Sequence, residues 1–281
     1  MLGSVACGRI GFDPTGGDPT GDAATSIDAP LPTGPFGPPM VVGELNTTSA
    51  EDDISLTADL LEIYFMTSRT GSNRLHRATR ATATDPWSPP TEVLELGTDI
   101  NNPRISNDGL SIYFSSDRTP NVGMADLWFA SRPDRTAAWL PPEPLPGINT
   151  PNNEIEPWVL DTQRVVYLTR SGSGIMRAER GSPTEPFGPP SVVAALDGPG
   201  YEGTAWVDET ERLVLFHSDR TPDRDLFYST RTGTEDWVAP LLITELNSAS
   251  ADADPWMSPD WRVVFFVSTR NGNYDVFMAT R

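Results

Sequence analysis

Carboxylates at two recurring positions are the side chains with the clearest chemical potential in this sequence. Aligning each acidic segment on the apolar segment after it gives one column of Asp53, Asn102, Glu156, Thr204 and Asp254, and a second of Glu51, Ile100, Glu154, Glu202 and Asp252. The columns lie two residues apart, so on β-strands both would face the same side. Carboxylates around one opening would concentrate a negative potential that attracts a cation or a cationic ligand.

A bound metal ion is one use for such carboxylates. Ca²⁺ takes about six to eight oxygen ligands, which makes it the natural ion for Glu154, Glu156, Asp252 and Asp254. We expect no other cofactor. The alternative is a solvated acidic rim on an acidic protein, whose formal net charge is −19.

Three tryptophans lie two residues after the first acidic column, at Trp158, Trp206 and Trp256. Aromatic faces near an opening can stack on sugar rings or hold a peptide, and packing between repeats is the alternative. The predicted ligand-binding residues are therefore Glu51, Asp53, Glu154, Glu156, Trp158, Glu202, Trp206, Asp252, Asp254 and Trp256.

Catalytic motifs are scarce. The only histidines are His76 and His217, without metal-ligand spacing, and no Gly-x-Ser-x-Gly elbow or phosphate loop occurs. We therefore predict no enzymatic activity. The alternative is a glycoside hydrolase or polysaccharide lyase that uses paired carboxylates, for which Glu51, Glu154, Glu202 and Asp254 are the candidates.

The segments that position these residues belong to an internal repeat of about 50 residues. An aromatic residue followed three positions later by Pro marks each copy, at Phe36, Trp87, Trp139, Phe187 and Trp237. Each copy contains an acidic segment, an apolar segment such as "RVVFF", a corner with Arg, and a segment such as "DVFMATR". Four short strands per repeat predict the blades of a β-propeller.

The phase of the repeats predicts how the ring closes. Residues 36–45 read as the outermost strand of a blade, whereas the chain ends at Arg281 on a third strand. Pairing 36–45 with the last repeat would remove two unpaired edges. We predict an all-β, five-bladed propeller of four-stranded antiparallel blades over residues 36–281, closed by its N-terminal strand and monomeric.

A recurrent arginine follows each apolar segment, and an aspartate often precedes the next strand. An arginine fork can bridge several carbonyls or a nearby carboxylate, so we expect both to be structural corner residues. The arginines are Arg69, Arg118, Arg170, Arg220 and Arg270, and the aspartates are Asp126, Asp225 and Asp275.

The N-terminal region has a different composition. Cys7 follows a short apolar stretch and indicates the end of a bacterial lipoprotein signal over residues 1–12, with lipidation at Cys7, although few residues and no positive charge precede it. An ordinary N-terminal cysteine is the alternative. Residues 13–35 contain mostly Pro, Gly, Thr, Asp and Ala, which predicts a disordered linker.

Net charge and hydropathy exclude two classes of partner. A charge of −19 argues against nucleic acid, because phosphate binding needs clustered basic residues. No run approaches about 18 apolar residues, so we expect no transmembrane segment.

The repeats resemble the TolB-like propeller repeats, relatives of WD repeats. The fifth copy matches their pattern best, at Pro255, Ser258, Pro259, Asp260, Ser268, Arg270, Gly272, Asp275 and Ala279. Copies one and three depart, with Arg74 and Gly174 where an Asp is expected. TolB itself also carries an N-terminal α/β domain, which has no counterpart here. The resemblance implies a module of the bacterial cell envelope that binds other molecules.

Together these observations predict an exported protein, periplasmic or attached to the outer membrane. We expect it to be a non-catalytic module that binds a protein or glycan ligand at the mouth of the propeller channel.

Overall fold

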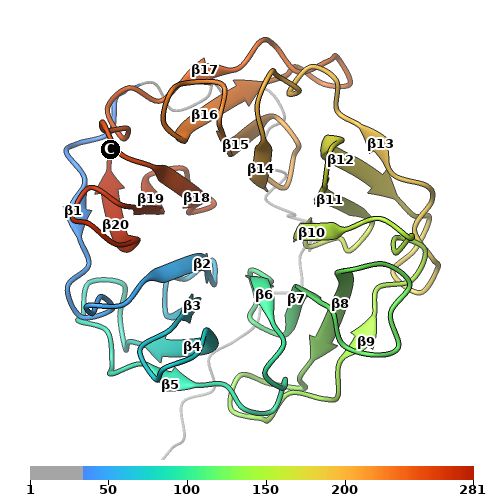
Figure 1. Cartoon of the computed structure of the whole chain (residues 1–281), viewed down its shortest axis with the longest axis horizontal. Coiled ribbons are helices and arrows are strands. Elements are labelled where there is room, and N and C mark those ends of the chain that lie inside the picture. The colour runs from blue at the N-terminus through green and yellow to red at the C-terminus, as the bar shows by residue number, and fades with distance from the viewer. Residues whose placement is uncertain (1–33) are drawn as a thin grey trace, which may run out of the picture. The chain divides into compact units, whose positions relative to one another are not determined.

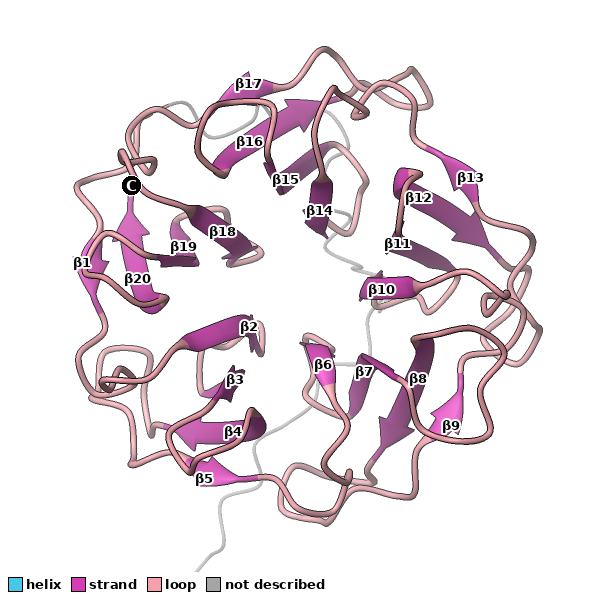
Figure 2. Ribbon diagram, viewed as in Figure 1, coloured by secondary structure: helices cyan, strands magenta, loops and turns pink. Residues whose placement is uncertain are grey.

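The described part of the chain is residues 34–281 of this computed structural model. In that range the regular secondary structure consists of short β-strands, without a helix. The strands form five four-stranded antiparallel sheets around a central axis (Figures 1 and 2). The predicted fold class is therefore confirmed. Cys7 and residues 13–33 of the predicted linker lie outside the described residues. No helix in the described range is long and apolar enough to cross a membrane.

The sheets are numbered here as blades I to V in chain order, each from its innermost to its outermost strand. Blade I contains β2 (Glu51–Leu56), β3 (Glu62–Thr67), β4 (Arg74–Thr79) and β5 (Thr91–Glu92). Blade II contains β6 (Asn101–Ile105), β7 (Ser111–Ser116), β8 (Asp126–Ser131) and β9 (Glu143–Pro144). Blade III contains β10 (Glu154–Val159), β11 (Val165–Arg170), β12 (Gly174–Glu179) and β13 (Ser191–Val192). Blade IV contains β14 (Glu202–Val207), β15 (Leu213–Ser218), β16 (Asp225–Thr230) and β17 (Leu241–Leu242). Blade V contains β18 (Asp252–Met257), β19 (Val263–Ser268), β20 (Asp275–Thr280) and the N-terminal β1 (Met40–Val41).

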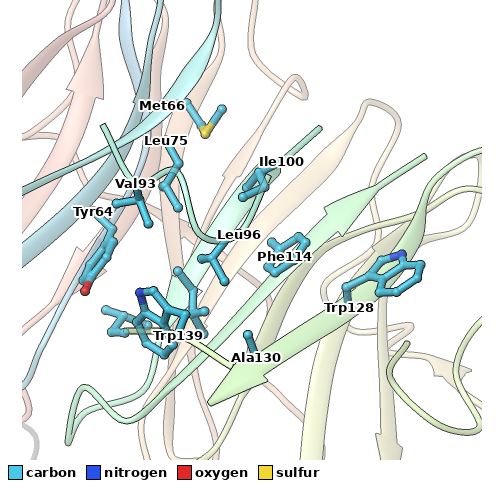
Figure 3. Close-up of a cluster of buried hydrophobic side chains, with 12 residues drawn as sticks. Tyr64, Met66, Leu75, Val93, Leu96, Ile100, Phe114, Trp128, Ala130 and Trp139 are labelled. Carbon is cyan, nitrogen blue, oxygen red and sulfur yellow. The ribbon is translucent and has the colours of Figure 1, made fainter. Parts of the chain in front are cut away.

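The hydrophobic core lies between neighbouring blades rather than within them. The second strand of each blade is covered on both faces, which explains its continuous apolar sequence. Between blades I and II, Tyr64 packs edge-to-face on Trp139 with ring centroids 6.2 Å apart. Leu75 and Val93 of blade I and Phe114 of blade II belong to the same buried cluster (Figure 3).

The aromatic residue that marks each repeat has a structural role in every blade. An arginine at the end of the third strand lies over its ring, at 4.2 to 4.8 Å from guanidinium carbon to ring centroid. The pairs are Arg80–Trp87, Arg132–Trp139, Arg180–Phe187, Arg231–Trp237 and Arg281–Phe36. The last pair joins the two ends of the propeller.

The N-terminal strand closes the ring as predicted. β1 pairs antiparallel with β20, with Met40 opposite Met278. Backbone hydrogen bonds from Gly37 to Thr280 (2.8 Å) and from Val42 to Val276 (2.9 Å) extend the pairing on both sides. The outer edge of β20 is therefore covered.

This closure makes the clasp part of the cooperative core. Leu45, at the end of the clasp segment 36–45, is fully buried. We expect Leu45→Ala to lower the free energy of unfolding by about 2–5 kcal/mol through lost contacts and a cavity. Urea denaturation measures the change, with Met40→Ala, whose side chain is exposed, as the control. An equal small effect of both variants would show that the clasp is dispensable.

Candidate functional site

A backbone irregularity in the innermost strand of every blade decides where the two acidic columns lie. The first column has left-handed backbone throughout, with φ of 46° to 54° at Asp53, Asn102, Glu156, Thr204 and Asp254. The pairing register of each innermost strand shifts at this point, as in a β-bulge. The first column lies at the bulge and the second lies two residues before it, and that both columns face one side stays a prediction. The columns lie in different surroundings.

The first column forms hydrogen bonds from blade to blade around the axis, where the innermost strands β2, β6, β10, β14 and β18 converge (Figure 1). The Asp53 carboxylate accepts the backbone N–H of Asn102 at 3.1 Å, and Glu156 accepts that of Thr204 at 2.8 Å. Asp254 accepts the N–H of Asp53 at 3.3 Å, which links blade V to blade I. These carboxylates therefore help to hold the ring closed.

Three carboxylates crowd together at the blade V–blade I junction. Oxygens of Asp52, Asp53 and Asp254 lie within 4.8 Å of one another, and Asp52 and Asp53 are partly exposed. Burial and the charge of Asp254 raise the pKa of Asp53 to about 7, and the same two causes raise the pKa of Asp52. This group of three is called the mouth cluster below.

His217 sets the ionisation of Asp254. Burial alone would raise the pKa of Asp254, but its hydrogen bond and charge interaction with His217 hold that pKa below its usual value. The His217 Nδ1 atom lies 3.3 Å from an Asp254 oxygen. The other ring nitrogen, Nε2, has no hydrogen-bond partner among residues 34–281.

Tyr201 connects His217 to Glu156. Its ring stacks on the His217 ring at 5.7 Å, and its hydroxyl donates to Glu156 at 2.8 Å. Burial and the charge of Glu156 raise the pKa of Tyr201. Arg224, which pairs with Asp219 at 2.8 Å, lies beside the Tyr201 ring.

Sequence reasoning missed Asp52, Tyr201 and His217. A weak signal was available for His217, because the equivalent position holds Met66, Ser115, Thr169 and Val267 in the other blades.

The second acidic column is buried in the corners of the blades, away from the mouth cluster. Arg69 binds Glu51 at 3.1 Å, Arg220 binds Glu202 at 3.2 Å and Arg270 binds Asp252 at 2.5 Å. The same arginine atoms also donate to a loop carbonyl, that of Leu45, Leu196 or Leu246. The corner role predicted for these arginines matches this geometry, whereas ligand binding by the column stays a prediction.

Two corners depart from this plan. Arg170 is the last residue of β11, whereas the other corner arginines lie two residues after the end of the second strand. It binds Glu154 at 2.8 Å through Nε. In blade II the carboxylate is replaced by Ile100, and Arg118 donates instead to the Asp99 carbonyl at 3.3 Å.

The tryptophan column packs between blades. Trp158, Trp206 and Trp256 are at most 5% exposed. Trp158 meets Trp206 edge-to-face at 5.7 Å, and its indole N–H donates to the Val207 carbonyl at 2.8 Å. The packing alternative therefore describes their surroundings, and their predicted ligand contact is untested.

The channel interior is narrow. A pocket lined by Asp53, Asn102, Arg104, Glu156, Thr204 and Pro255 leaves about 20 Å³ for water, little more than the roughly 10–15 Å³ that one molecule needs. Arg104 is buried there, donates to the Ser55 hydroxyl at 3.2 Å, and makes no ion pair within residues 34–281. Burial lowers its pKa. A ligand of sugar size therefore does not fit in this pocket.

The four residues proposed for Ca²⁺ are not brought together. Glu154 and Asp252 pair with arginines in the corners of blades III and V. Only Asp254 joins a carboxylate group with suitable spacing in the described part of the chain, and its neighbours there are Asp52 and Asp53.

No protein-family model and no curated protein matches this sequence. Among solved structures, a family-43 glycoside hydrolase is similar with a TM-score of 0.61 and 12% identity, over 84% of this chain and 90% of that one. A GH62 α-L-arabinofuranosidase domain from Coprinopsis cinerea has a TM-score of 0.60 and 12% identity, over 88% and 96%. A protein assigned as TolB from Agrobacterium tumefaciens has a TM-score of 0.50 and 19% identity, over 82% and 76%. These likenesses show the five-bladed fold.

The raised pKa of Asp53 has a measurable consequence. Between about pH 4 and pH 7 the folded protein holds a proton on Asp53 that the unfolded chain has released, so this group lowers stability as the pH rises. Asparagine cannot titrate, so the variant should not lose stability in this way. Relative to wild type, we expect the free energy of unfolding of Asp53→Asn to be about 1–2 kcal/mol higher at pH 8 than at pH 5. Denaturation in EDTA at pH 5 and at pH 8 measures this difference. The exposed Glu95→Gln is the control, and a pH-independent difference for Asp53→Asn would contradict the assignment.

Proposed function

We propose that this protein is a non-catalytic binding module of the bacterial cell envelope that holds a protein or glycan ligand at the mouth of its channel. The observation that carries the proposal is the mouth cluster, in which Asp52, Asp53 and Asp254 approach within 4.8 Å. Ionised carboxylates this close repel one another, and a positively charged group on a ligand, or a cation such as Ca²⁺ bridging to it, would relieve the repulsion.

The surrounding contacts favour binding at the surface of the ring. Asp53 and Glu156 already accept backbone N–H groups of the next blade, and the space beneath them holds about one water molecule. Asp52 and Asp53 are the partly exposed residues of this group, so a ligand would approach them from outside.

The envelope location rests on the N-terminal sequence and on the fold. Lipidation of Cys7 followed by the linker 13–35 would tether the propeller to a membrane, and the TolB-like repeats are of a kind used in the cell envelope. Partners with exposed amino groups, such as proteins and cell-wall fragments, suit the acidic mouth.

Thermal melting of the protein against cell-wall fragments and oligosaccharides, in EDTA and in Ca²⁺, tests this proposal. A ligand at 100 times its dissociation constant stabilises the native state by about 2.7 kcal/mol, so a true ligand should shift the melting temperature by several degrees. We expect the double variant Asp52→Asn/Asp53→Asn to lose the shift and Glu95→Gln to keep it. A shift that survives in the double variant would place the ligand elsewhere.

A carboxylate-dependent glycosidase is the second candidate, because Asp53 has a raised pKa and the adjacent Asp254 a lowered one. Such a split is typical of an acid and base pair. Of the candidates from the sequence, Glu51, Glu154 and Glu202 lie in the corners with arginines, and only Asp254 lies in the mouth cluster.

Turnover of aryl glycosides and arabinan distinguishes this candidate from a binding module. A hydrolase would lose at least about 100-fold in kcat with Asp53→Asn or Glu156→Gln, while its KM would change little. We expect the wild-type protein to show no more turnover than Asp254→Asn, which serves as the negative control. Wild-type activity that these variants lose would show a hydrolase and contradict the binding proposal.

A further inference from the structure

The seam between blades III and IV contains a cavity that includes Glu202 of the second acidic column. It is lined by the β11–β12 turn at Gly172, Ser173 and Gly174, and by the loop before β14 at Asp197, Gly198, Gly200, Tyr201 and Glu202. Its volume is about 370 Å³, within the range of pockets that bind small molecules.

Glu202, one of the residues that line this cavity, has a carboxylate oxygen without a hydrogen-bond donor. Glu202 is 1% exposed, and its Oε1 atom accepts from Ser218 at 3.0 Å and Arg220 at 3.2 Å. Its Oε2 atom has no hydrogen-bond donor anywhere in residues 34–281. A buried carboxylate oxygen without a donor is costly, so this atom is primed to accept one.

The other corners show what is missing. In blades I, III and V a Thr or Ser four residues earlier donates both its backbone N–H and its hydroxyl to the corner carboxylate. These donors are Thr47, Thr150 and Ser248. In blade IV the equivalent residue is Gly198, which supplies no hydroxyl.

A second glycine opens the same seam. Gly174 begins β12 where blades II, IV and V have Asp126, Asp225 and Asp275. A Cβ atom there would lie 4.0 Å from Glu202 Oε2 and 3.2 Å from a carboxylate oxygen of the exposed Asp197. Two carboxylates therefore flank the space that the missing side chain leaves.

The loop that forms the cavity is held in place. A Cβ on Gly200 would come within 2.6 to 2.9 Å of backbone atoms of Asp219 and Arg220, so only glycine permits this close approach. Tyr201 follows directly, and its hydroxyl is fixed by Glu156 at 2.8 Å. The cavity is thus preformed, with an aromatic residue in its wall.

We propose that this seam cavity is a binding site for a primary ammonium group, as on a lysine side chain or an amino sugar. An ammonium group supplies several N–H donors and a positive charge, which replace the donors lost at Gly198 and pair with Glu202 and Asp197. Tyr201 also lines the cavity, but its ring already stacks on His217 and lies beside Arg224, so recognition of the cation rests on the two carboxylates. Ca²⁺ fits less well, because it needs about six to eight oxygens and the cavity offers two carboxylates. The site is separate from the mouth cluster and does not depend on the proposed function.

Isothermal titration of the full chain tests the site with Nα-acetyl-lysine methylamide and glucosamine, each paired with its N-acetylated form. We expect one of the free amines to bind at least tenfold more tightly than its acetylated twin, and the preferred amine identifies the source of the group. Equal binding of amine and amide, or no binding of either amine, overturns the proposal.

Two variants locate the binding. Gly198→Ser should place a hydroxyl beside the Glu202 carboxylate, so it should reduce amine binding at least tenfold. Its added Cβ would lie 2.7 Å from Glu202 Oε1 and 2.9 Å from an Arg220 nitrogen, so we also expect a lower melting temperature. Gly43→Ser, at a position with no atom within 4 Å of the added Cβ, is the matched control and should bind normally. Glu202→Gln should lose binding as well. If either variant fails to fold, Asp197→Asn decides the test, because this exposed carboxylate also lines the cavity and its loss should reduce amine binding at least tenfold.

Binding at the channel mouth would give a different pattern. If Asp52→Asn/Asp53→Asn abolishes amine binding while Gly198→Ser retains it, the ammonium group occupies the mouth cluster and the seam site is disproved. If the mouth variant binds the amine normally and Gly198→Ser does not, the seam site stands whether or not the mouth has a ligand.

Discussion

Closing five blades into a ring brings their innermost strands together at one axis, where each strand lacks a partner on its inner side. The left-handed residue of these strands provides a hydrogen bond on that side, because it directs a backbone N–H toward the preceding blade. Asp53, Glu156 and Asp254 accept three of these groups. The channel carboxylates therefore have a structural role in closing the ring, whether or not a ligand binds there. The second acidic column lies instead in the blade corners, where Glu51, Glu202 and Asp252 pair with arginines.

The outer rim repeats a fixed set of contacts in every blade. Each third strand ends in an arginine that donates to a carbonyl in the turn before the second strand, at 2.5 to 2.7 Å. The same arginine covers the aromatic residue of its repeat, including Arg281 over Phe36. Because these contacts recur in all five blades, they explain most of the repeat consensus without reference to function. Residues that differ between blades are consequently the more informative ones.

The architecture could be predicted from the sequence because the points at which the repeats begin and end leave few ways to pair the terminal strands. The position of Phe36 and Arg281 at complementary points of the repeat required the clasp that the β1–β20 pairing shows. The site was less predictable because it depends on local backbone conformation. Nothing in "EDD" reveals that residue 53 is left-handed, so strict alternation placed Glu51 beside it. Likewise, the five arginines look equivalent in the sequence, yet Arg170 is displaced by two positions because the turn after β11 is short.

Three departures from the repeat lie together in blade IV. His217 replaces residues without a charge, Tyr201 follows a glycine-rich loop, and Gly198 replaces a hydroxyl donor. Their effects are linked, because Tyr201 stacks on His217 and donates to Glu156, while its neighbour Glu202 lines the seam cavity. Tyr201 therefore belongs both to the wall of the seam cavity and to the contacts of the channel residue Glu156. Residues that are particular to blade IV thus link the seam cavity to the channel, a link that the repeated contacts alone do not provide.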